Sequence, residues 1–158
     1  MKIIFLDIDG VLNSRIYDGK RDKSRQTDID ETRLPLVKSI VDRTGAKIVL
    51  SSTWRVHWDK NPDKCDEDGA YINSTFAKFG LEVYGKTPDL GIDFDRPEEI
   101  SAWLECAAEE IKSFVIIDDY RYAWGKLSDN FVKTNPNFGL GLEEEHVKQA
   151  IEILNTKN

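Results

Sequence analysis

The chain has few cysteines and no long apolar run, and both shortages narrow the classes of protein to consider. Its two cysteines, Cys65 and Cys106, stand in unrelated sequence contexts, so we expect free thiols in a reducing cytoplasm rather than a disulfide framework. Without a CxxC motif or a His/Cys cluster, a zinc site is not expected. No apolar segment approaches the ~20 residues that span a bilayer. Asp7 and Asp9 also interrupt what would be the apolar core of a secretory signal.

The chain also lacks an excess of positive charge. Its net charge of −7 at pH 7 argues against strong non-specific binding to nucleic acid, which normally uses a basic face. One basic cluster, interspersed with aspartates, consists of Lys20, Arg21, Lys23 and Arg25. We interpret this polar segment as a solvated loop, and contact with an anionic substrate is the alternative.

What the chain does contain is an alternation of strand and helix patterns along its 158 residues, enough for one domain, 1–158. We expect strands at residues 2–8, 47–51, 81–84, 114–117 and 131–134. We expect a helix that carries Pro35 in its first turn and stops at Gly45, and further helices at residues 72–80, 97–110 and 143–154. This alternation predicts an α/β fold, a doubly wound, Rossmann-like parallel sheet with helices on both faces.

Three of the expected strands end in polar side chains, namely Asp7 and Asp9, Ser51 and Ser52, and Asp118 and Asp119. Ligands of doubly wound sheets bind outside the carboxyl ends of the strands. Asp7 and Asp9 are two residues apart on an extended chain, so their side chains can converge. Together with Asp118 they predict an oxygen-only site that suits Mg²⁺. Because Mg²⁺ usually keeps positions open for phosphate oxygens, the site indicates phosphoryl chemistry.

Phosphoryl transfer also needs donors that hold the remaining phosphate oxygens. Ser51 or Ser52 can supply a hydroxyl and a backbone N–H, although the cap of a helix is an alternative role for them. Arg96 is our choice for the cation, because its guanidinium fork matches phosphate oxygens. Lys86 and Arg55 are the competing cations, and a surface ion pair is the alternative role for Arg96.

The segments FLDIDGVLN, IVLSS, DRPEEI and FVIIDD resemble, in this order, the four motifs of the haloacid dehalogenase (HAD) superfamily. The segments SSTWR, RPEEISAWL and NFGL are similar to the HAD domains of Swiss-army-knife RNA repair proteins, in which a Trp–Arg pair follows the second motif, as Trp54 and Arg55 do here. The resemblance covers nearly the whole chain. Larger members insert a cap domain after the first motif or between the second and third. The first gap of this chain is only a polar loop of about twenty residues, and the longer second gap, residues 53–95, carries sheet-like elements of its own. We therefore expect no large cap domain.

The resemblance implies a role for each of the acidic residues. Asp7 would be the nucleophile that becomes an aspartyl-phosphate. Asp9 would protonate the leaving oxygen and then deprotonate the attacking water. Asp7, the backbone carbonyl of Asp9, and Asp118 would bind Mg²⁺, with Asp119 acting through a water molecule.

The phosphate contacts and the type of reaction follow from the same resemblance. Ser51 or Ser52 would hold the transferring phosphoryl group, and Arg96 would stand where the family most often has Lys. Members that cleave carbon–halogen bonds do not use an acid/base aspartate at the position of Asp9, so a phosphatase is favoured. Its substrate is left open between a small phosphate ester, a nucleotide and a nucleic-acid end. A site without a cap implies either a macromolecular substrate or a homo-oligomer that covers the site.

A non-catalytic module that uses the same scaffold to bind phosphate or a partner is the alternative function. The presence of Asp7, Asp9, Ser51 and Asp118 together argues against it. We interpret the tryptophans as packing residues, with contact to a nucleobase as the alternative for those at positions 54 and 58. The two lone histidines receive no role.

Overall fold

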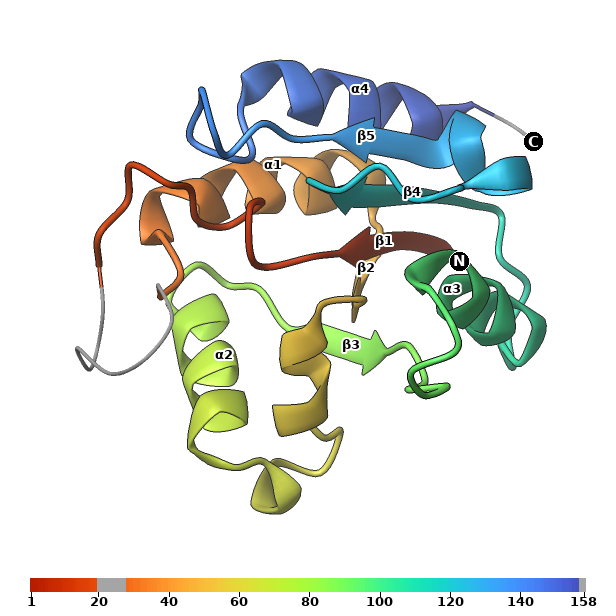
Figure 1. The fold of residues 1–158 in the computed structure, drawn as a ribbon, viewed down its shortest axis with the longest axis horizontal. Helices are drawn as coiled ribbons and strands as arrows, with labels where there is room; N and C mark the ends of the chain where they lie inside the picture. Colours follow the sequence, from red (N-terminus) through yellow and green to blue (C-terminus); the bar gives the residue numbers. More distant parts are fainter. Residues whose placement is uncertain (20–27, 157–158) are drawn as a thin grey trace.

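Five strands form one fully parallel sheet in the order β3–β2–β1–β4–β5 (Figure 1). The computed structural model describes residues 1–19 and 28–156, so the basic cluster of residues 20–25 lies outside the described residues. The strands are β1 (Lys2–Leu6), β2 (Lys47–Leu50), β3 (Val83–Lys86), β4 (Ser113–Asp118) and β5 (Phe131–Lys133). The predicted α/β fold with a parallel sheet is therefore confirmed.

The two faces of the sheet are covered by different helices. Ile4 and Leu6 of β1 belong to a core cluster that also includes residues of α1 (Leu34–Thr44), α2 (Glu67–Ala77) and α4 (Glu144–Asn155). Ile3 and Phe5 point to the other face, in a cluster with residues of α3 (Arg96–Glu105). Figure 1 shows α1 and α4 side by side, with α3 on the other side of the sheet. The strands are apolar on both faces because both are shielded from water.

The ends of the helices follow from local signals, and three of them differ by more than one residue from the sequence prediction. α1 has Pro at its start and ends at Gly45, whose φ of 69° is left-handed, as expected. α2 begins five residues before the expected Ile72, because the side chain of Asp66 accepts hydrogen bonds from two backbone N–H groups of the first turn. α2 ends at Ala77 rather than at residue 80, and α3 ends at Glu105 rather than at residue 110.

The connections that leave the carboxyl edge of the sheet after β1 and β2 are long, but their described residues form few regular elements. Between β1 and α1 the described residues form a loop with one 3₁₀ turn, η1 (Glu31–Arg33). Between β2 and β3 lie η2 (Thr53–His57), η3 (Pro62–Lys64) and α2. In this described part of the chain no separate cap domain stands over the sheet. None of the described helices has the length and apolar character needed to cross a lipid bilayer.

Candidate active site

The register of the sheet places three of the candidate residues in one row. Leu6, the last residue of β1, is paired with both β2 and β4. The next position along each of these strands holds Asp7, Ser51 and Asp118. The chain then leaves β1 toward α1 and β4 toward η4 (Gly125–Asn130), on opposite faces of the sheet. The row therefore lies at the crevice where ligands of doubly wound sheets bind.

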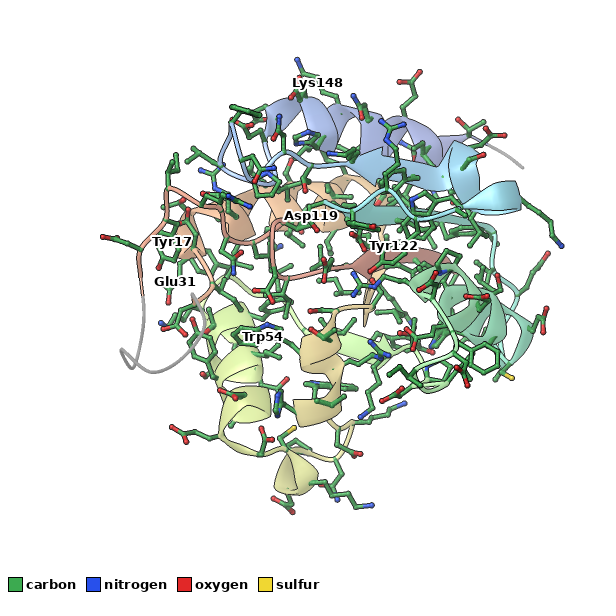
Figure 2. The ribbon with its side chains drawn as sticks, in the orientation of Figure 1. Tyr17, Glu31, Trp54, Asp119, Tyr122 and Lys148 are labelled. Carbon is green, nitrogen blue, oxygen red and sulfur yellow. The ribbon has the colours of Figure 1, made fainter. Side chains whose placement is uncertain are left out.

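Three carboxylates meet at this crevice. Oxygen atoms of Asp7, Asp118 and Asp119 all lie within 4.8 Å of one another. Asp7 is 5 % and Asp118 is 0 % exposed. Figure 2 shows Asp119 on the side toward which the arrowheads of β1 and β4 point. Gly10 makes this approach possible, because a Cβ at its left-handed φ of 80° would come within 2.5 Å of the Asp119 carboxylate.

Arg96 is the cation at the centre of the group. Its Nη1 lies 2.5 Å from Oδ2 of Asp118 and 3.1 Å from Oδ2 of Asp7. Arg96 is the first residue of α3, and Asp95 before it forms a capping box that fixes the start of the helix. The arginine is 9 % exposed. It therefore faces the carboxylates, and a surface ion pair is not its role.

The two competing cations are engaged elsewhere. Nζ of Lys86 donates to the backbone carbonyls of Arg55 and Trp58, at 3.2 and 2.5 Å. Nη2 of Arg55 donates to Oε1 of Glu99 at 2.5 Å, and both side chains are buried. This buried pair connects η2 to α3, the helix that carries Arg96. Both cations thus brace the walls of the crevice.

The electrostatics of the cluster favour a further positive charge. Burial raises the pKa of Asp7 to about 7, although Arg96 opposes the shift. Burial and the neighbouring Asp118 also raise the pKa of Asp119. Burial disfavours the charge of Arg96, but Asp7 and Asp118 outweigh it and raise the pKa of the guanidinium. One guanidinium thus faces three carboxylates. A divalent cation that prefers oxygen ligands fits this donor set.

The two serines after β2 have different surroundings. Oγ of Ser51 is fully buried and has no hydrogen-bond partner among the described residues. Oγ of Ser52 accepts a hydrogen bond from the backbone N–H of Trp54 at 3.3 Å and caps η2. The cap expected as an alternative role is thus found at Ser52. Ser51 keeps its hydroxyl available, which is unusual for a buried polar atom.

The carboxylate of Asp9 lies outside the three-carboxylate cluster and is held by two donors. The indole Nε1–H of Trp54 donates to its Oδ2 at 2.9 Å, and Nδ2 of Asn13 donates to its Oδ1 at 3.0 Å. Sequence reasoning missed both donors and treated Trp54 as a packing residue. The signal that could have identified them is their position, because each belongs to a segment that follows a strand carrying candidate site residues.

A cavity of about 670 Å³ opens over the acidic residues. It is lined by polar and aromatic side chains as well as the acids, including Arg15, Thr53, Tyr120, Tyr122 and Asn137. The segment after β5 supports the floor of this cavity. Oγ1 of Thr134 donates to the carbonyl of Gly10 at 2.8 Å. The cavity is large enough for a phosphate ester and part of its leaving group.

Comparison with known families agrees with this geometry. Residues 3–147 match a family model described as the HAD domain in Swiss Army Knife RNA repair proteins. No curated protein and no solved structure gives a significant match to the chain. The matched range contains every candidate residue of the crevice.

Proposed function

The chain belongs to the family of HAD domains in Swiss Army Knife RNA repair proteins, and from this premise we propose that it is a Mg²⁺-dependent phosphatase that hydrolyses a phosphate monoester. The observation that carries the proposal is the group formed by the buried Asp7 and Asp118 and the half-buried Asp119 against Arg96. Like charges at this distance are costly to bury without a compensating cation. Mg²⁺ is the natural choice for such a donor set, because it is bound by carboxylates and leaves room for phosphate oxygens.

The acidic residues divide the chemistry between them in this proposal. An oxygen of Asp7 forms a bond to phosphorus while the bond from phosphorus to the leaving oxygen breaks, and Asp9 gives that oxygen its proton. Asp9 then takes a proton from the water that attacks the aspartyl-phosphate, which frees phosphate and restores Asp7. Asp7, Asp118 and the backbone carbonyl of Asp9 would hold Mg²⁺, with Asp119 contributing through a water molecule. The bound ion would offset the negative charge of the phosphoryl oxygens.

Ser51 and Arg96 are the phosphate-binding residues that we propose. The unpartnered hydroxyl of Ser51 supports its choice, because a bound phosphoryl oxygen would supply the missing partner. Ser52 is the weaker candidate, since its hydroxyl already caps η2. Nη1 of Arg96 contacts the carboxylate of Asp7, so the guanidinium is within reach of a phosphoryl group attached there.

For the substrate we propose a nucleotide or the phosphorylated end of a nucleic acid. The name of the family refers to RNA repair proteins, and the cavity has no cap over it among the described residues. Tyr120 on the cavity wall is 61 % exposed, with its ring edge-on to that of Tyr122 at a centroid distance of 4.6 Å. An exposed aromatic face can stack on a base. We place the enzyme in the cytoplasm, since Cys65 and Cys106 are free thiols.

A panel of phosphate esters tests the proposal. It would include p-nitrophenyl phosphate, nucleotides and oligonucleotides with a 3′- or 5′-phosphate, each with Mg²⁺ and with EDTA. We expect turnover that needs Mg²⁺ and is lost in Asp7→Asn. The matched control is Asp129→Asn, which changes an exposed carboxylate of η4 and keeps activity. Absence of Mg²⁺-dependent turnover across the panel would contradict the proposal and favour a non-catalytic phosphate-binding module.

A further inference from the structure

Asp9 lies outside the acidic cluster, and two uncharged side chains hold its carboxylate. Oδ2 accepts from the indole of Trp54, and Oδ1 accepts from the amide of Asn13. The two bonds engage both oxygens, so they fix the rotation of the carboxylate as well as its position. A general acid must lie within hydrogen-bond reach of the oxygen that it protonates. What orients Asp9 therefore bears directly on the reaction.

Both donors are themselves fixed. Trp54 is 8 % exposed, and its ring packs against Tyr71 at a centroid distance of 6.4 Å. Its backbone N–H is held by the hydroxyl of Ser52. Oδ1 of Asn13 accepts from the backbone N–H of Gly10 at 2.8 Å, which leaves its Nδ2 to face Asp9. Neither donor can turn away from the carboxylate without breaking contacts of its own.

The chemistry of the two donors determines where a proton on Asp9 can go. An indole N–H can donate and cannot accept a hydrogen bond, and Asn13 presents to Asp9 its amide NH2 group, which also only donates, while its carbonyl oxygen faces Gly10. A proton on Asp9 therefore finds no acceptor in Trp54 or Asn13. The cavity, which Asp9 also lines, is where an acceptor can approach. The proton is thus directed toward a leaving oxygen.

We propose that Trp54 and Asn13 are positioning residues that orient Asp9 for proton transfer to the leaving group and from the attacking water. This inference rests on the proposed phosphatase function. In this proposal Trp54, the first residue of the Trp–Arg pair, has a role at the site in addition to packing in the core.

Substrates with different leaving groups separate this role from a structural one. Departure of p-nitrophenolate needs little help from an acid, whereas departure of an alkoxide from β-glycerophosphate needs a proton. We expect Trp54→Phe to slow single-turnover cleavage of β-glycerophosphate by about 10- to 100-fold. The pre-steady-state burst of p-nitrophenolate should stay within about twofold of the wild-type rate. The slower phase after the burst should fall as well, because Asp9 also activates the water.

The chain offers a matched control and an independent variant. Nε1 of Trp58 donates to Oδ1 of Asn73 at 2.8 Å, in the same core cluster, so Trp58→Phe removes a similar bond away from Asp9. It should change neither rate. Asn13→Ala removes the second donor and should likewise slow the cleavage of β-glycerophosphate but not the burst of p-nitrophenolate. This variant tests the inference even if Trp54→Phe does not fold.

The outcomes distinguish the inference from the function on which it rests. The inference is overturned if both variants cleave the two substrates at wild-type rates, or if they slow the burst and the cleavage of β-glycerophosphate in equal proportion. The proposed function fails, and the inference with it, if the wild-type protein turns over neither these two substrates nor any other member of the phosphate-ester panel.

Discussion

Nη1 of Arg96 bridges Asp7 and Asp118, at 3.1 Å from the first carboxylate and 2.5 Å from the second. Removing this bridge leaves two buried carboxylates without their counter-charge. In the metal-free protein we expect Arg96→Met to lower the free energy of unfolding by about 3 kcal/mol. Urea denaturation in EDTA measures the loss. Mg²⁺ should restore part of it, and equal stabilities of variant and wild type would contradict the role of the bridge.

Asp7 should make the stability of the metal-free protein depend on pH. Burial raises the pKa of Asp7 in the folded protein to about 7, whereas the pKa of an aspartate in an unfolded chain is about 3.9. Between these two pKa values, Asp7 holds a proton in the folded state but not in the unfolded state. The free energy of unfolding therefore falls as the pH rises through this range. We expect Asp7→Asn to become more stable than the wild type as the pH increases toward about 8.

Urea unfolding curves in EDTA across this pH range measure the difference. Asp129→Asn serves as the control and should leave the pH dependence unchanged. Because a proton competes with the ion, we also expect the affinity for Mg²⁺ to increase as the pH rises through about 7, as calorimetry can show. The prediction is contradicted if the free energy of unfolding of the wild type, relative to that of Asp7→Asn, rises with pH instead of falling.

The serines after β2 should separate stability from binding. Ser51→Ala removes a buried hydroxyl that lacks a partner among the described residues. The free energy of unfolding should therefore change by less than about 0.5 kcal/mol, while kcat/KM should fall about 10- to 100-fold. Ser52→Ala removes the cap of η2 and should cost about 1 kcal/mol, with the smaller effect on kcat/KM. Denaturation and steady-state kinetics on the same samples test the contrast. Unchanged kcat/KM in Ser51→Ala would rule out its proposed contact with phosphate.

Local patterns in the sequence were enough to predict most of the fold. The central strands are short apolar runs that end in polar residues, and α1 lies between Pro35 and Gly45, which mark its ends. The start of α2 was predicted wrongly at Ile72, because apolar spacing shows only the part of a helix that faces the core. Its first turn is polar and is held by Asp66. The strand expected at 81–84 lies two residues later, at Val83–Lys86.

The contacts around the site depend on residues that are distant in the sequence. Trp54 and Asp9 are 45 residues apart, and Arg55 and Glu99 are 44 apart. No spacing rule connects such positions, since only the order of the strands brings them together. The motifs thus indicated which residues belong to the crevice, whereas the pairing of each donor with its acceptor required the structure.

The Arg55–Glu99 pair should behave as a structural brace. Both side chains are buried, so Arg55→Met or Glu99→Leu alone leaves an uncompensated charge and should cost about 3 to 5 kcal/mol. The double variant should cost less than the sum of the two single changes, as a double-mutant cycle of urea unfolding measures. If Arg55 were a phosphate contact instead, a variant that still folds would show a raised KM without a comparable loss of stability.

Phosphorylation of Asp7 is the most direct test of the central claim. The protein would be mixed with p-nitrophenyl phosphate and Mg²⁺, quenched in acid, and its peptides analysed by mass spectrometry. Asp9→Asn should accumulate phosphate on Asp7, because water attack then lacks its base while departure of p-nitrophenolate needs little acid, and Asp7→Asn should carry none. Mg²⁺-dependent turnover with phosphate on another residue, or on none in Asp9→Asn, would contradict the assignment of Asp7 as the nucleophile.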